Sequence, residues 1–124
     1  MRIRRISWLG VKTDSYQETR DFFADVAGLD VAYEKPDFAV FRMADGDLLE
    51  VFGPDADDPP EQFAAEKVVA GLLVDDIDEA TATLRAAGIE LLGPQQSGSD
   101  GYRWQHFRLP DGKVFELSTG PGAD

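Results

Sequence analysis

A repeated phrase constrains the fold of this chain more than any other feature of its sequence. RMADGDLLEV at residues 42–51 returns as RLPDGKVFEL at residues 108–117. An Asp-Gly pair between two apolar segments predicts a tight hairpin, so the chain contains one hairpin twice, and each copy ends in a strand with a glutamate. The shared residues lie 66 positions apart: Phe41, Arg42, Asp45, Gly46 and Glu50 recur as Phe107, Arg108, Asp111, Gly112 and Glu116.

The segment before the first hairpin predicts a strand and a helix. Residues 3–12 alternate and are rich in β-branched and aromatic side chains, which is typical of a strand. Ser15 stands three residues before Glu18, the spacing of a helix-capping box, and Gly28 closes the helix. The expected apolar face of this helix consists of Tyr16, Phe22, Phe23 and Val26. The expected strands that follow are at residues 29–33, 38–43 and 48–52.

The second half predicts the same elements in the same order. A strand at residues 68–74 precedes Asp76, which stands three residues before Glu79 as a helix cap, and Gly88 closes the second helix. The expected apolar face of that helix consists of Ile77, Ala80, Leu84 and Ala87. The expected strands that follow are at residues 89–92, 102–109 and 114–118.

Each half is therefore a βαβββ module, and a module of this size cannot fully bury its own sheet. The sequence predicts an α+β fold in which two modules pack together as a single domain over residues 1–124. Module one covers about 1–53 and module two about 67–121, and the acidic, proline-containing segment at about 54–66 links them.

The charge balance limits the possible partners. Twelve Lys and Arg residues against 24 Asp and Glu residues give a formal net charge of −12. Long-range repulsion disfavours nucleic acid and anionic membranes, so we expect a neutral or cationic small molecule as the partner. The chain has no cysteine, which excludes disulfides, thiolate catalysis and cysteine-ligated zinc. Neither a signal peptide nor an apolar stretch of membrane-spanning length is recognisable, so we expect a cytoplasmic protein.

Two helix entries and two hairpins carry a family resemblance. The entries read TDSYQETRDFFADVAGL and VDDIDEATATLRAAGIEL, and the hairpins read FRMADGDLLEVF and FRLPDGKVFEL. Together they resemble the vicinal oxygen chelate superfamily, which includes glyoxalase I, extradiol dioxygenases, and the fosfomycin- and bleomycin-resistance proteins. The resemblance covers nearly the whole chain and implies two βαβββ modules that curl around a shared pocket, often within a homodimer.

In the metal-using members of that superfamily, the first and last strands of each module each supply one ligand to a divalent ion. Glu50 and Glu116 match the last-strand positions, whereas Trp8 and Val69 occupy the first-strand positions and have no metal-binding side chain. We therefore expect no cofactor, although two carboxylates and water could hold Mg²⁺ or Mn²⁺ weakly.

Strand alternation predicts which side chains face the pocket. On the last strand Val114, Glu116 and Ser118 share one face, and a three-residue loop at 110–112 would place His106 opposite Glu116. Trp8 would offer a flat ring for stacking against a ligand. The same counting predicts the other residues that line the pocket. They are Trp8, Gly10, Lys12, Phe38, Val40, Arg42, Leu48, Glu50, Phe52, Val69, Trp104 and Arg108.

Three functions remain open on this basis. The first is a metal-independent protein, similar to bleomycin-resistance proteins, that binds or sequesters a hydrophobic or cationic organic molecule. The second is a lyase, isomerase or dioxygenase that uses residual metal at Glu50 and Glu116, or His106 and Glu116 as an acid–base pair. The third is a structural or regulatory protein with a vestigial pocket. Glyoxalase I activity itself is not expected, because that chemistry needs the metal.

The same residues also have purely structural interpretations. The two glutamates would then pair with Arg42, Arg108 or Lys12, and His106 would be an ordinary strand histidine. Trp8 and Trp104 would pack in the core.

Overall fold

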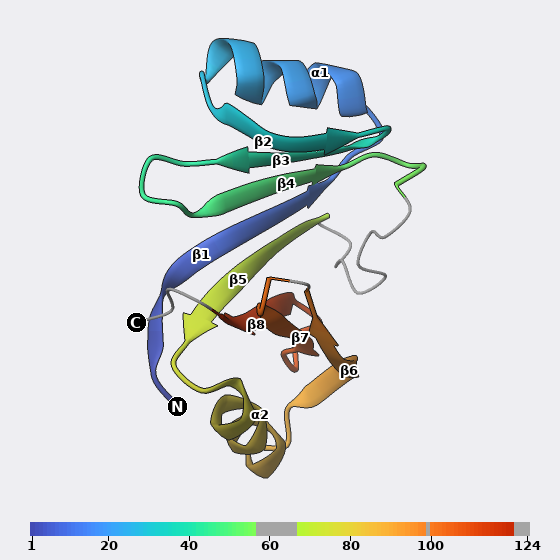
Figure 1. Ribbon diagram of the computed structural model, residues 1–124. Helices are drawn as coiled ribbons and strands as arrows, with labels where there is room; N and C mark the ends of the chain where they lie inside the picture. The colour runs from blue at the N-terminus through green and yellow to red at the C-terminus, as the bar shows by residue number, and fades with distance from the viewer. Residues whose placement is uncertain (57–66, 99, 121–124) are drawn as a thin grey trace. The chain divides into compact units, whose positions relative to one another are not determined.

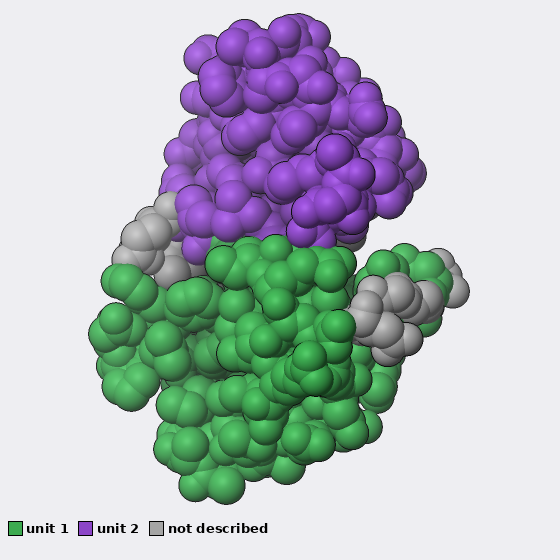
Figure 2. Space-filling view, turned by 90° about the vertical axis from the view of Figure 1, so that its left-hand side faces the viewer, with its two compact units in different colours: residues 1–7, 69–124 green, residues 8–68 purple. Residues whose placement is uncertain are grey.

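The computed structural model describes residues 1–56, 67–98 and 100–120, and the chain divides into two compact units. Unit 2 is Trp8–Val68, and unit 1 comprises Met1–Ser7 and Val69–Asp124 (Figure 2). The fold is α+β and consists of two βαβββ modules. Part of the predicted linker, residues 57–66, lies outside the described residues.

Unit 2 has the strand order β2-β3-β4-β1. β1 runs parallel to β4, whereas β3 runs antiparallel to both β4 and β2. Its predicted strands are confirmed to within a few residues. The elements of this module are β1 (Ile3–Lys12), α1 (Tyr16–Asp21), the π-helical turn η1 (Phe22–Val26), β2 (Asp30–Lys35), β3 (Phe38–Arg42) and β4 (Leu48–Phe52). Figure 1 labels α1 and the strands, and the first half of β1, up to Ser7, belongs to unit 1.

One face of this sheet packs against α1 and η1. The alternation of the strands directs every second side chain toward the helix, and burying these apolar groups stabilises the unit. The buried residues of this cluster are Ala39, Phe41, Leu49 and Val51, and those packed against it are Leu9, Val11, Tyr16, Phe23, Ala24, Leu29 and Met43.

The first helix differs from its prediction in two respects. The side chain of Ser15 makes no capping hydrogen bond; instead the Ser15 N–H donates to Oγ1 of Thr13 at 2.9 Å. Phe22 and Val26 are 50% and 75% exposed, so they do not belong to the apolar face. The cause is η1, where the Ala27 N–H donates to the carbonyl of Phe22 five residues back, and this wider turn changes the helical period.

Unit 1 repeats the architecture with the strand order β5-β8-β7-β6. β5 runs parallel to β8, and β7 runs antiparallel to both β8 and β6. The elements are β5 (Val68–Val74), α2 (Ile77–Ala86), β6 (Glu90–Ser97), β7 (Arg103–Arg108) and β8 (Val114–Thr119).

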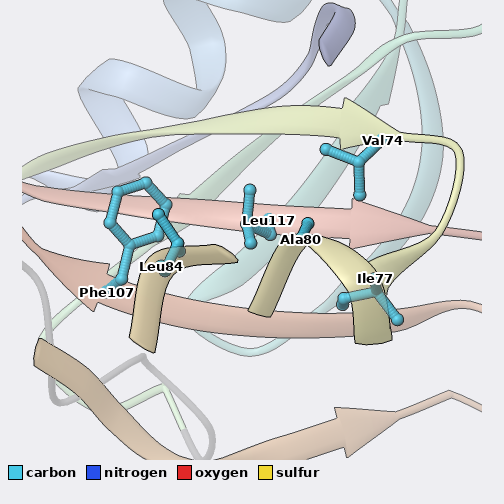
Figure 3. Packing of buried hydrophobic residues seen from close by; sticks show 6 residues of the cluster. All are labelled: Val74, Ile77, Ala80, Leu84, Phe107 and Leu117. Carbon is cyan, nitrogen blue, oxygen red and sulfur yellow. The ribbon is translucent and has the colours of Figure 1, made fainter. Parts of the chain in front are cut away.

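The core of unit 1 lies between α2 and the sheet. Figure 3 shows side chains of α2 directed toward Leu117 and Phe107. Ala87, predicted for the apolar face, is exposed because it is the C-cap residue of α2 rather than part of its last turn. The buried members of the cluster are Val74, Ile77, Ala80, Leu84, Phe107 and Leu117.

Asp76 caps α2 as predicted, because its Oδ1 accepts hydrogen bonds from the Asp78 and Glu79 N–H groups at 3.0 and 3.1 Å. We expect Asp76→Ala to lower the free energy of unfolding by about 1 kcal/mol, since these donors lose their acceptor. Ser15→Ala is the matched control and should change it by less than about 0.5 kcal/mol. Urea denaturation of both variants checks this, and equal losses would contradict the assignment of the caps.

The repeated hairpins have the same turn. The Met43 N–H donates to the Asp47 carbonyl at 2.8 Å, and the Leu109 N–H donates to the Lys113 carbonyl at 2.9 Å. In each turn a glycine has a φ of 94°, in the left-handed region that favours glycine. The predicted three-residue loop of the second hairpin is therefore confirmed.

β6 is longer than the predicted strand at 89–92, and its pairing with β7 shifts register between Leu92 and Gln96. The buried side chain of Gln105 lies against this irregularity. Its amide donates to the carbonyls of Leu92, Gly93 and His106 at 3.2, 2.9 and 3.1 Å. Nothing in the spacing of the sequence indicated this role for Gln105.

Candidate functional site

In each unit the sheet face opposite the helix carries the glutamate of the repeated hairpin. We call these surfaces the glutamate face of unit 2 and the glutamate face of unit 1. The residues on the glutamate face of unit 2 are Trp8, Gly10, Lys12, Phe38, Val40, Arg42, Leu48, Glu50 and Phe52. Those of unit 1 are Val69, Gly71, Leu73, Trp104, His106, Arg108, Val114, Glu116 and Ser118.

The glutamate face of unit 2 is largely aromatic. The rings of Phe38 and Phe52 lie 5.0 Å apart between centroids at 49°, and both residues are buried. Trp8 and Val40 are partly buried and pack against this pair. Phe38 of β3 is paired with Phe52 of β4, and side chains of paired residues lie next to each other on the same face of the sheet. The register of the two strands therefore brings the two rings together.

Each glutamate has a buried glycine as its partner on the parallel strand. Gly10 of β1 pairs with Glu50, and Gly71 of β5 pairs with Glu116. Trp8 and Val69, the predicted first-strand ligand positions, lie two residues earlier on the same face as these glycines. Gly71 was not among the predicted pocket residues, although Gly10 was predicted at the equivalent position of the first module.

His106 and Glu116 pair across β7 and β8, as predicted. Nε2 of His106 lies 3.4 Å from Oε2 of Glu116, and the two residues are 5% and 6% exposed. The contact lacks hydrogen-bond geometry, and Nε2 has no hydrogen-bond partner among the described residues. Burial lowers the pKa of His106 to about 4, so the imidazole is neutral at pH 7 and the contact is not an ion pair there.

The nearby arginine has a different partner. Nη1 of Arg108 lies 3.3 Å from Oε2 of Glu90 on β6, in an exposed ion pair. This pair joins β7 to the neighbouring strand β6.

The two faces differ at equivalent positions of the repeat. Val40 pairs with Glu50 where His106 pairs with Glu116. Three apolar side chains of the first module are replaced by smaller or polar ones in the second: Trp8 by Val69, Val40 by His106 and Phe52 by Ser118. The fourth, Phe38, is replaced by the larger aromatic Trp104, and the two faces are therefore chemically distinct.

A metal ion would need more ligands than either face supplies by itself. Unit 2 offers Glu50, and unit 1 offers Glu116 with His106. No group of three or more His, Cys, Asp or Glu side chains suited to a metal occurs in residues 1–56, 67–98 and 100–120. Because Trp8 and Val69 occupy the first-strand positions, the residues do not fit the family's ligand pattern, and we derive no chemical step through a metal.

The family model of the Glyoxalase/Bleomycin resistance protein/Dioxygenase superfamily matches residues 5–117. The chain belongs to this superfamily. The predicted resemblance and the predicted fold are therefore confirmed. The comparison with curated proteins found no match.

Solved structures of the superfamily have the same fold. A glyoxalase/bleomycin resistance protein/dioxygenase superfamily member from Vibrio splendidus is 23% identical with a TM-score of 0.68, and the match covers 93% of this chain and 97% of that one. Streptomyces coelicolor methylmalonyl-CoA epimerase, in complex with 2-nitronate-propionyl-CoA, is 21% identical with a TM-score of 0.71, over 98% and 100% of the two chains. The Mn(II)-bound glyoxalase from Novosphingobium aromaticivorans is 24% identical with a TM-score of 0.73, over 95% of this chain and 39% of that one.

No helix in the described part of the chain is long and apolar enough to cross a membrane; the two α-helices span six and ten residues.

Proposed function

We propose that this superfamily member binds a planar organic molecule, hydrophobic or cationic, on the glutamate face of unit 2. The observation that carries the proposal is Trp8. It occupies a first-strand ligand position of the family, and its ring packs beside Phe38 and Phe52 on the face that holds Glu50. Aromatic rings bind planar molecules by stacking, and a tryptophan face attracts cations.

Charge supports a cationic ligand. The net charge of −12 attracts cations at long range, and Glu50 supplies a carboxyl group on the face itself. Small-molecule ligands occur among the superfamily structures, such as methylmalonyl-CoA in an epimerase complex. Those relatives support the binding of an organic molecule by this chain. The aromatic residues around Trp8 support a planar ligand rather than a CoA ester.

Fluorescence titration with 1-methylquinolinium and with quinoline tests this proposal, because the two probes have the same shape and differ in charge at pH 7. The chain has two tryptophans, so Trp104→Phe leaves Trp8 as the reporter and Trp8→Phe leaves Trp104. We expect saturable quenching in Trp104→Phe, with at least about fivefold tighter binding of the cation.

Glu50→Gln keeps the shape of the face and removes its charge, so it should abolish the preference for 1-methylquinolinium. Saturable quenching of Trp104 alone, or no saturation with either probe, would overturn the proposal for unit 2. Metal analysis of the protein purified without an affinity tag accompanies the titration. Stoichiometric metal that is lost in Glu50→Gln or Glu116→Gln would favour a metal-dependent enzyme instead.

An enzyme that uses His106 and Glu116 as an acid–base pair has less support. Such a pair needs an imidazolium to donate a proton near neutral pH, whereas burial lowers the pKa of His106 to about 4. A neutral imidazole can still donate a hydrogen bond from its N–H group, which is a binding role. We therefore assign His106 to recognition rather than to proton transfer.

A further inference from the structure

Nε2 of His106 is a buried polar atom without a hydrogen-bond partner among the described residues. An unsatisfied buried polar group costs about 1–3 kcal/mol, which is why such groups are uncommon in folded proteins. The side chain is 6% exposed and lies on the glutamate face of unit 1, opposite the face that packs against α2. A partner for this nitrogen would therefore have to reach that face from outside the strand pair.

The pairing of β7 with β8 does not require a histidine at position 106. In unit 2 the equivalent position is Val40, which pairs with Glu50 in the same register. Valine is therefore compatible with this place in the hairpin, and it leaves no nitrogen to satisfy. The desolvation cost of an imidazole at this position points to a role in binding.

The neighbouring carboxyl group decides what kind of partner fits. Oε2 of Glu116 lies 3.4 Å from Nε2, and a neutral imidazole carries its N–H on one nitrogen. Two acceptor atoms at this distance would repel each other, so the tautomer with the hydrogen on Nε2 is favoured. The pair thus presents one donor and one acceptor side by side.

We propose that His106 and Glu116 form a subsite on the glutamate face of unit 1 that binds a hydroxyl group of an organic ligand. The hydroxyl oxygen accepts a hydrogen bond from the N–H of His106, and the hydroxyl hydrogen is donated to the carboxyl oxygen of Glu116. The ligand class is an aromatic alcohol or phenol. This inference rests on the proposed function, because it assumes that the protein binds an organic molecule.

The test compares 4-methylphenol with 1,4-dimethylbenzene, in which a methyl group replaces the hydroxyl. Isothermal titration calorimetry should show that the phenol binds at least about tenfold more tightly, the effect of one to two net hydrogen bonds. His106→Val should reduce this preference to less than about twofold. Val40 shows that the hairpin accommodates valine, so this variant is expected to fold.

A second measurement needs no variant. The chain contains a single histidine, so ¹⁵N labelling of histidine gives one imidazole spin system. The Nε2 resonance should shift and saturate with 4-methylphenol and stay in place with 1,4-dimethylbenzene.

Three results would overturn the inference: equal affinities for the two probes, an imidazole resonance that the phenol does not move, or a preference that persists in His106→Val. The quinolinium titration separates this failure from that of the proposed function. If Trp8 is quenched and the phenol has no advantage, only the hydroxyl subsite is wrong. If none of the four compounds binds, both proposals are wrong.

Discussion

Phe41→Ala should lower the free energy of unfolding by about 3–5 kcal/mol, the largest effect that we expect from a single substitution. Phe41 is 0% exposed and lies at the centre of the cluster between β3, β4 and the first helix. Its ring lies 6.0 Å from that of Phe23, so alanine removes an aromatic contact as well as buried volume. Denaturant unfolding followed by circular dichroism measures the loss.

Phe22→Ala is the matched control for this prediction, because the same substitution is made on the helix that covers Phe41. Phe22 is 50% exposed, so we expect a loss below about 1 kcal/mol. Phe23 packs against the cluster that contains Phe41, whereas its neighbour Phe22 does not. Similar losses in the two variants would mean that the first helix packs with Phe22 directed inward.

The second large effect is a dependence of stability on pH. The pKa of His106 falls from 6.5 to about 4 on folding because the imidazole is buried, so the unfolded chain binds the proton first as the pH falls. Protonation of this group therefore does not lower the free energy of unfolding above pH 6.5. Between pH 6.5 and 4 the free energy of unfolding falls as the pH falls, because the unfolded chain gains the proton. The loss amounts to about 3 kcal/mol.

His106→Val isolates this contribution, because it removes the only histidine and leaves every carboxyl group in place. The difference in unfolding free energy between the protein and the variant should fall with decreasing pH between 6.5 and 4, and it should be constant from pH 7 to 8. Urea denaturation at half-unit intervals of pH measures both curves. Parallel curves over the whole range would show that the imidazole is not buried in the folded protein.

The hairpins explain why so much of the fold was predictable. Asp45-Gly46 and Asp111-Gly112 fix the turn, the turn fixes the register, and the register decides which side chains share a face. The pairing of His106 with Glu116 follows from this counting and is confirmed. The roles of these residues in binding stay predictions.

The features that the sequence did not reveal are departures from a regular period. The π turn at Phe22–Val26 and the register shift in β6 each change the local spacing, and pattern analysis assumes that the spacing is constant. The unsatisfied nitrogen of His106 was also unpredictable, because it depends on the angle between two side chains that are already known to be neighbours.

The irregular β6 strand has a consequence for behaviour at high protein concentration. A regular outer strand is a template on which another chain can add a strand, which is one route to aggregation. β6 and β2 are the outermost strands of their units, and the pairing of each with its neighbour contains a register shift. Pro94 also removes one N–H donor from β6. Gln105 donates hydrogen bonds to the carbonyls of Leu92 and Gly93 at this irregularity, and an irregular edge strand is a poorer template for fibril growth than a regular one.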